Sequence, residues 1–177
     1  MEFVLLDVAE EASGEQVVVN LEGAMEKHGW FGPTIERLVD IMRYPDKANE
    51  FGCLKVTPTV IRAATFSLCR SMGENAPAPR IVPTPGGGLI LEWLEYWVDM
   101  GVEIDPSGAL QVVLNGDPEF FKKHGRSFGV AKTPFSETSA TWTIFDDVFT
   151  SGLDLLEVLR KEGPPPERKK EHQEKLK

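Results

Sequence analysis

The most regular stretch of the chain alternates apolar and polar residues between positions 98 and 104. Its apolar members occupy every second position: Val98, Met100, Val102 and Ile104. Asp99, Gly101 and Glu103 fill the positions between them. Because successive side chains of a strand point to opposite faces of a sheet, this pattern predicts a strand with one buried face and one face in water. An antiparallel sheet that is covered on one side has this pattern.

Short apolar segments around this strand predict an antiparallel meander. Its expected strands are residues 80–83, 89–94, 98–104 and 110–114. Pro83 ends the first strand or places it at a sheet edge, because proline cannot donate to a strand ladder. Three glycines at 86–88 supply a turn, and Asp105-Pro-Ser-Gly108 fits a type I turn with Asp first, Pro second and Gly last.

Two helices are predicted before the meander, over residues 33–43 and 57–72. Pro33 opens the first helix at a position where its missing N–H costs nothing. The apolar residues of this helix fall at helical spacing: Ile35, Leu38, Val39 and Met42. Thr57 can cap the second helix, and Pro58 fits its first turn. The buried face of the second helix is expected to contain Ile61, Ala64, Leu68 and Met72.

The sequence also predicts the roles of two residues next to the second helix, Gly73 and Trp93. Gly73 is expected to adopt the left-handed conformation that follows the last turn of many helices. Trp93 falls on the same side of its strand as Leu89 and Leu91, so we expect it in the core under the second helix.

The remaining segments are less regular. Residues 3–8 and 16–21 are β-rich and flank a Ser-Gly turn, which favours an N-terminal hairpin. The other expected elements are a helical turn at 118–124, an irregular loop at 125–138, a strand near 139–145 and a helix at about 151–161. Together the pattern predicts an α+β fold, an antiparallel sheet packed on one face by two or three helices.

Length and tail composition divide the chain in two. Its 177 residues suit a single domain, expected over residues 1–162. Residues 163–177 begin with a glycine and three prolines and have almost no apolar content, so they are expected to be a disordered or solvated basic tail.

The net charge of −9 is unevenly distributed. Residues 160–177 contain seven Lys and Arg against four Glu, a net of +3, so residues 1–159 carry twelve against twenty-four, a net of −12. An acidic body repels phosphate backbones, and we do not expect the folded part to bind nucleic acid.

Export and membrane insertion are not expected. No run of about 18 apolar residues occurs, and residues 1–7 lack the basic start of a secretory signal. The two cysteines, Cys53 and Cys69, are too few for a disulfide framework. We therefore expect a cytoplasmic protein, with Cys69 a buried free thiol in the second helix.

The residue types of common active sites lack the necessary spacing. His28, His124 and His172 do not stand at metal-ligand spacing with another His or Cys, so no metal site is expected. Cys53 could meet a histidine in space as a nucleophile, but two residues make a weak motif. The glycines at 86–88 precede a strand and lack a nearby lysine, so they do not fit a phosphate loop. No cofactor is predicted.

Carboxylates and aromatics near the alternating strand are the remaining candidates. Asp105 follows the acids of this strand in sequence, but its first expected role is in the turn at residues 105–108. A solvated sheet face explains the acids, whereas exposed aromatics beside carboxylates are typical of a protein-binding patch. The candidate binding residues are Glu92, Glu95, Tyr96, Trp97, Asp99 and Glu103.

Residues 52–114 contain a series of short motifs: Thr57-Pro58, Ala76-Pro-Ala-Pro79, Ile81-Val-Pro-Thr84, Gly87-Gly88, Leu91-Glu-Trp93, Val102-Glu-Ile104 and Asp105-Pro-Ser-Gly108. This pattern resembles that of a group of uncharacterised small bacterial and phage proteins. The chain departs from it before Gly52, where Phe51-Gly52 replaces an expected Trp-x-Gly segment. This resemblance supports the fold and implies a bacterial or phage setting, but it carries no activity.

The hypothesis that these observations favour is a non-catalytic, acidic protein that binds another protein. A phage or mobile-element regulator, an inhibitor and an antitoxin-like protein would all fit this description. One alternative is a small carboxylate-dependent hydrolase, with or without a metal ion. A second is a self-associating structural protein. In each case the expected site lies on the uncovered sheet face or at the Tyr96–Trp97 connection.

Overall fold

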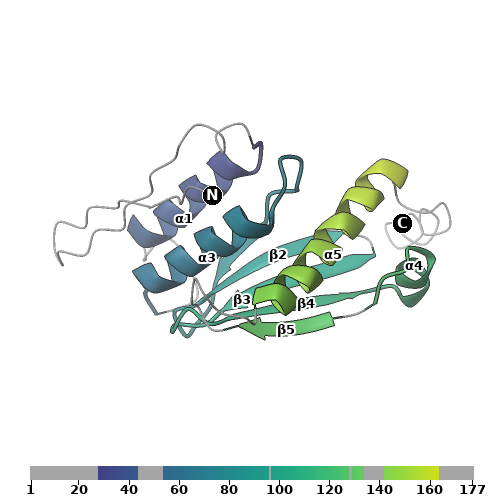
Figure 1. Cartoon of the computed structure of the whole chain (residues 1–177). Coiled ribbons are helices and arrows are strands. Elements are labelled where there is room, and N and C mark those ends of the chain that lie inside the picture. Colours follow the sequence, from purple (N-terminus) through teal and green to yellow (C-terminus); the bar gives the residue numbers. More distant parts are fainter. Residues whose placement is uncertain (1–27, 44–53, 96, 128, 134–141, 164–177) are drawn as a thin grey trace, which may run out of the picture.

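A computed structural model of the chain describes residues 28–43, 54–95, 97–127, 129–133 and 142–163. Within these residues the chain forms one five-stranded antiparallel sheet and four helices. The longer helices lie together on one face of the sheet (Figure 1). The predicted α+β class and its one-sided packing are thus confirmed. Among the described helices, none is long and apolar enough to cross a membrane.

The sheet is a simple meander in which each strand pairs with the next. Its strands are β1 (Arg80–Pro83), β2 (Leu89–Glu95), β3 (Val98–Ile104), β4 (Leu110–Gly116) and β5 (Gly129–Thr133), in that spatial order. The apolar positions of β3 are all buried, as the alternation predicts. Pro83 lies in β1, an edge strand that pairs on one side only, and proline's missing N–H is tolerated in such a strand.

The two predicted turns of the meander are present. The N–H of Gly87 donates to the Thr84 carbonyl at 3.0 Å, with Gly87 at φ +87°. In the second turn the N–H of Gly108 donates to the Asp105 carbonyl at 2.8 Å. The Asp105 carboxylate also accepts from the Ser107 hydroxyl at 2.6 Å and from the Ala109 N–H at 3.1 Å. These short-range bonds explain why the turns could be predicted from local sequence.

Four helices accompany the sheet: α1 (Phe31–Arg43), α3 (Pro58–Ser71), α4 (Pro118–Lys123) and α5 (Trp142–Glu162). Thr57 caps α3 as predicted, accepting from the Val60 N–H at 3.4 Å. The prediction for Gly73 is wrong, since it does not have a positive φ. The helix instead ends at Met72 in an extended conformation, which leads directly into the proline-rich linker and needs no left-handed residue.

The C-terminal elements differ most from the sequence prediction. Residues 142–145 belong to α5, so the strand expected near 139–145 is wrong over its described part, and the helix expected at 151–161 begins much earlier. A short apolar run fits either period, and packing decides between them. Phe145, Phe149 and Leu156 lie at helical spacing and are fully buried.

Two smaller outcomes concern residues 118–133. The helical turn predicted at 118–124 is α4, capped by Asp117. The loop predicted at 125–138 contains β5, which pairs with β4 through Val112 and Ala131.

The predicted N-terminal hairpin and the tail beyond Gly163 lie outside the described residues. Gly163 itself follows α5 with φ +71°, as expected for a helix end.

The core lies between the helices and the inner face of the sheet, the face that α1, α3 and α5 cover. Trp93 is buried there as predicted, but its ring contact is with Phe149 of α5, at 5.4 Å between centroids. Its indole N–H donates to the Pro77 carbonyl at 2.8 Å. Such an aromatic pair contributes about 0.5–1.5 kcal/mol of stability beyond that from burying its surface. The same ring therefore holds together β2, α5 and the linker.

Gly152 in α5, on the helix-covered side of the sheet, and Gly101 in β3, facing the other side, offer a matched test of this arrangement. A Cβ on the buried Gly152 of α5 would collide with Met100 and contact Leu114, whereas a Cβ on Gly101 would meet no atom within 4 Å. We predict that Gly152→Val lowers the free energy of unfolding by about 1–3 kcal/mol. Gly101→Val should leave it unchanged or raise it by up to about 1 kcal/mol. Urea denaturation measures both, and equal losses would contradict the assignment of the two faces.

The Asp105 turn has a pH dependence of known sign. The Ser107 hydroxyl bond, with backbone N–H bonds, holds the pKa of Asp105 below its ordinary value. The resulting stabilisation is complete above pH about 4 and is lost as pH falls through the folded-state pKa. We predict that Asp105→Asn lowers stability at pH 7 by no more than about 1 kcal/mol, since the site is exposed. Its Tm difference from wild type should shrink towards pH 2, and a constant difference would contradict this account.

Candidate functional site

The sheet face that points away from the helices, called here the outer face, is the first part of the candidate site. Strand register arranges its side chains in three rows across the strands. The rows are Val82–Ile90–Glu103–Gln111–Lys132, Arg80–Glu92–Gly101–Val113–Val130 and Leu94–Asp99–Asn115. None of the described helices covers these positions (Figure 1). The outer face therefore mixes apolar side chains with charged ones in a single layer.

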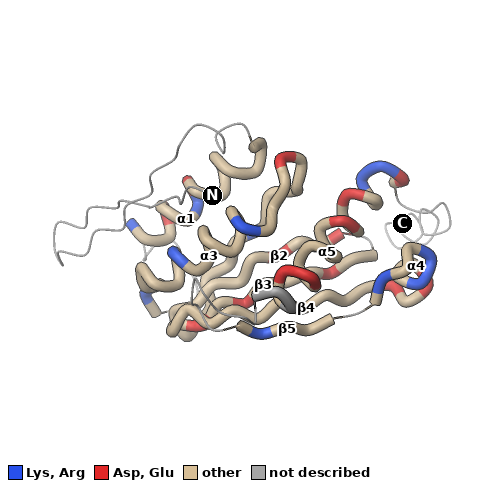
Figure 2. The backbone as a smooth tube through the Cα atoms, in the orientation of Figure 1, with Lys and Arg blue, Asp and Glu red and all other residues tan. Residues whose placement is uncertain are grey.

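Charge on the outer face is more balanced than the sequence suggested. Its three carboxylates lie on β2 and β3, and its two basic residues, Arg80 and Lys132, lie on the edge strands. Figure 2 shows the charged positions along the backbone. Arg80 approaches Glu92 at 3.6 Å with a side chain that is 71% exposed, so this pair contributes little stability. The centre of the face is acidic and its two edges are basic.

Much of the excess negative charge belongs to residues 1–27, which the structure does not describe. They contain seven Asp and Glu against one Lys. The described residues contain fifteen Asp and Glu against twelve Lys and Arg, a net of −3. The predicted acidity of the body is thus concentrated in the N-terminal segment.

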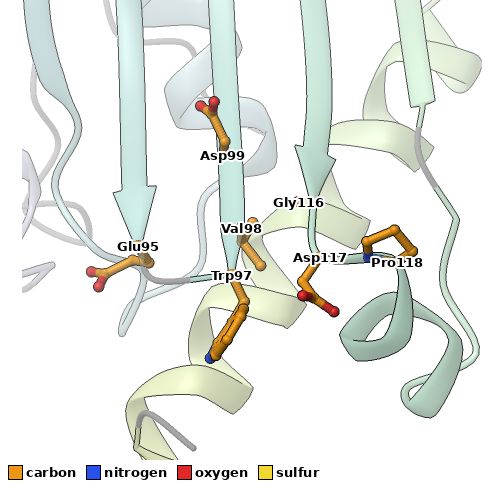
Figure 3. A pocket seen from close by; sticks show the side chains of 7 residues that line it. All are labelled: Glu95, Trp97, Val98, Asp99, Gly116, Asp117 and Pro118. Atoms are coloured by element: carbon orange, nitrogen blue, oxygen red, sulfur yellow. The ribbon is translucent and has the colours of Figure 1, made fainter. Parts of the chain in front are cut away.

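The second part of the site is a shallow pocket at the end of the sheet, called here the end pocket. It has a volume of about 340 Å³ and is lined by Glu95, Trp97, Val98, Asp99, Gly116, Asp117 and Pro118 (Figure 3). The pocket forms where the β2–β3 connection meets the start of α4. The Asp117 N–H donates to the Trp97 carbonyl at 3.0 Å, and a Cβ on Gly116 would collide with that carbonyl.

The carboxylates of the end pocket do not converge. Figure 3 shows the side chains of Glu95, Asp99 and Asp117 pointing in different directions. One oxygen of Asp117 also accepts the N–H groups of Glu119 and Phe120, both at 3.0 Å, which caps α4. A paired-carboxylate hydrolase needs two acids directed at one bond, and this pocket does not present them.

The structure divides the six predicted binding residues between these two places. Glu92, Asp99 and Glu103 lie on the outer face. Glu95, Trp97 and Asp99 line the end pocket, and Trp97 is half-buried against the core. Asp99 belongs to both, so the two parts adjoin. Tyr96 lies outside the described residues.

Sequence reasoning did not include the apolar residues of the outer face among the candidate binding residues. Leu94 and Val130 are 59% and 61% exposed, and Val82, Ile90 and Val113 are half-buried beside the charged rows. The alternation within residues 89–94 and 110–114 already assigned Leu94 and Val113 to this face. Val130 could not be assigned because β5 was not predicted.

The candidate metal-binding and nucleophilic residues do not assemble into a site in the part of the chain that the structure describes. No group there of three or more His, Cys, Asp or Glu could hold a metal ion. The His124 ring packs on Phe120 at 4.6 Å, with its Nε2 3.9 Å from the Glu162 carboxylate. Cys53 and His172 lie outside the described residues. Cys69 is half-buried rather than fully buried, and burial raises its pKa to about 11.

The Cys69 thiol should therefore react slowly. In a Cys53→Ser variant, we predict that Ellman's reagent labels native protein at pH 8 at least about tenfold more slowly than urea-unfolded protein, because the thiolate is the reactive form. Absorbance at about 412 nm measures the labelling. Equal rates would contradict the effect of burial on this thiol.

Comparison with known proteins does not add to this geometry. Scans against protein-family models, curated proteins and solved structures gave no match. The resemblance of residues 52–114 to small bacterial and phage proteins stays a prediction.

Proposed function

We propose that the chain is a non-catalytic protein-binding protein, with the outer face and the end pocket as its interface. The observation that carries this proposal is the composition of the outer face. It places half-buried valine and isoleucine side chains beside carboxylates, and no described helix covers it. An apolar layer edged by charge is what protein interfaces commonly present.

The size of the surface is consistent with this role. Five strands of up to seven residues span roughly 20 by 20 Å, given a strand spacing of about 4.8 Å and a rise of about 3.3 Å per residue. That area, roughly 400 Å², is about half of what one partner contributes to a standard interface. The adjoining end pocket, with Trp97 beside it, would supply part of the remainder.

The charge of the chain selects the class of partner. A net charge of −9 steers association towards basic proteins and away from nucleic acid. Within this proposal the chain acts in the cytoplasm as a regulator, an inhibitor or an antitoxin-like protein. A bacterial or phage setting follows from the resemblance of residues 52–114.

A charge reversal tests the proposed interface. Tagged protein captures partners from cells of the organism that encodes the chain, and the affinity of the identified, purified partner is then measured by calorimetry. We predict that Asp99→Lys with Glu103→Lys weakens binding at least about tenfold, or about 1.4 kcal/mol, because both carboxylates lie at the centre of the outer face.

The matched control reverses two exposed acids on α1, Glu36→Lys with Asp40→Lys, which changes the net charge by the same amount. This control variant should bind within about twofold of wild type. Unchanged binding by the outer-face variant, or an equal loss in both variants, would sink the proposal.

A further inference from the structure

One row of the outer face combines a hollow with a projecting apolar side chain. In this row, Gly101 of β3 and Val130 of β5 lie on either side of Val113. A Cβ on Gly101 would meet no atom within 4 Å, whereas Val130 is 61% exposed. The hollow and the projecting side chain are therefore two strands apart in the same sheet.

The neighbouring row has opposite charges on the same two strands. Glu103 of β3 and Lys132 of β5 lie on either side of Gln111. Both charged residues are exposed, and neither forms an ion pair or side-chain hydrogen bond with a residue that the structure describes. Two strand spacings, about 9.6 Å, separate them within the sheet, so they do not neutralise each other there.

We infer that two copies of the chain pack their outer faces on each other through β3, β4 and β5. A two-fold axis that runs over β4 along the strand direction keeps every residue in its own row and exchanges β3 of one copy with β5 of the other. Sheets packed face to face lie about 10 Å apart with strands aligned to within about 30°, which this axis permits. The inference goes beyond the proposed function, since it names a second copy of the chain as the occupant of this half of the outer face.

This axis sets complementary groups of β3 and β5 against each other. Glu103 of one copy faces Lys132 of the second copy, and Gly101 faces Val130 of the second copy. Because a two-fold interface is isologous, each of these contacts occurs twice. The charges that are too far apart to pair within one sheet thus pair between two sheets, and the projecting valine fills the hollow over the glycine.

The outer-face residues of β4 lie on the axis, where each meets its own counterpart. These residues are Gln111, Val113 and Asn115, and none of them is charged. The two valines form an apolar centre, and an amide side chain both donates and accepts hydrogen bonds, so it can pair with its own copy. Asp99 lies beyond the start of β5 at Gly129 and so stays at the rim of the overlap.

Other positions of the axis pair these groups badly. An axis over β3 would set Glu103 against Glu103 of the second copy, and like charges placed opposite each other cost stability. An axis between β3 and β4 would exchange β2 with β5, which sets Lys132 against Ile90 and Glu92 against Val130. Covering a charge with an apolar side chain is unfavourable. The position over β4 is therefore favoured over both.

The size of the overlap indicates a weak dimer. β5 has five residues, so three strands overlap over roughly 14 by 17 Å, or roughly 240 Å², at standard spacings. This area is well below the roughly 800 Å² per partner of a standard interface, so we expect a Kd between about 10 µM and 1 mM. At about 0.15 M salt, repulsion between two acidic chains is largely screened beyond about 8 Å, whereas the two ion pairs are in contact.

Charge reversal followed by mixing tests the pairing directly. We predict that sedimentation equilibrium of the full chain shows monomer converting to dimer between about 10 µM and 1 mM. Glu103→Lys alone and Lys132→Glu alone should each raise the Kd at least about fivefold, because each sets like charges against each other. An equimolar mixture of these two variants should form a heterodimer with a Kd within about twofold of wild type, because every lysine then faces a carboxylate again.

The matched controls make the same changes of charge outside the overlap. Glu92→Lys on β2 and Arg80→Glu on β1 should leave the Kd within about twofold of wild type. Gln111→Glu is an independent variant of nearly unchanged shape. It sets two carboxylates against each other on the axis and should also raise the Kd. Circular dichroism checks that each variant is folded.

Three results would overturn the inference. They are a wild-type chain that stays monomeric at about 1 mM, an equal loss of dimer in the control variants, and a mixture of Glu103→Lys with Lys132→Glu that stays monomeric. A dimer that survives both single charge reversals uses another surface and would overturn it as well.

Failure here can be told apart from failure of the proposed function. Partner affinity is measured at about 1 µM chain, below the expected dimer Kd, so that loss of the dimer does not contribute to it. If the chain is monomeric but Asp99→Lys with Glu103→Lys abolishes partner binding, the proposed interface stands and the dimer falls. If the dimer forms but that variant binds its partner as wild type does, the proposed interface falls instead.

Discussion

The close packing of α5 on the sheet is the constraint on which the rest of the structure depends. Gly152 brings the helix so near to β3 and β4 that even one added carbon would collide with Met100. Phe149 on the same helix packs against Trp93 of β2. Because interiors are close-packed, these contacts fix which sheet face is buried beneath the described helices.

The two faces of β3 differ in how much they contribute to folding. On the inner face every second residue is buried, and on the outer face Asp99 and Glu103 are exposed around a glycine that the described fold does not require. Exposed carboxylates on a central strand contribute little to folding. In the proposed interface their placement serves association, where charge selects partners and sets encounter rates.

Local patterns accounted for most of the meander and little of the C-terminal third. Alternation and turn chemistry, as at Asp105 and Gly108, operate within a few residues, so they could be predicted from sequence. The apolar run before Phe145 fits both a strand and a helix, and burial of Phe145 and Phe149 decided for the helix. β5 is short, and its pairing with β4 depends on a partner strand that local sequence does not reveal.

The sequence by itself determined the fold class, the strands from 80 to 114 and the face that each of their side chains occupies, because a strand has a period of two. Only the tertiary structure decided that Val130 and Lys132 join the outer face and that Asp99 borders both this face and the end pocket. It also decided that the pocket acids diverge (Figure 3). These features arise where segments distant in the chain meet, and packing between layers, rather than local periodicity, sets such contacts.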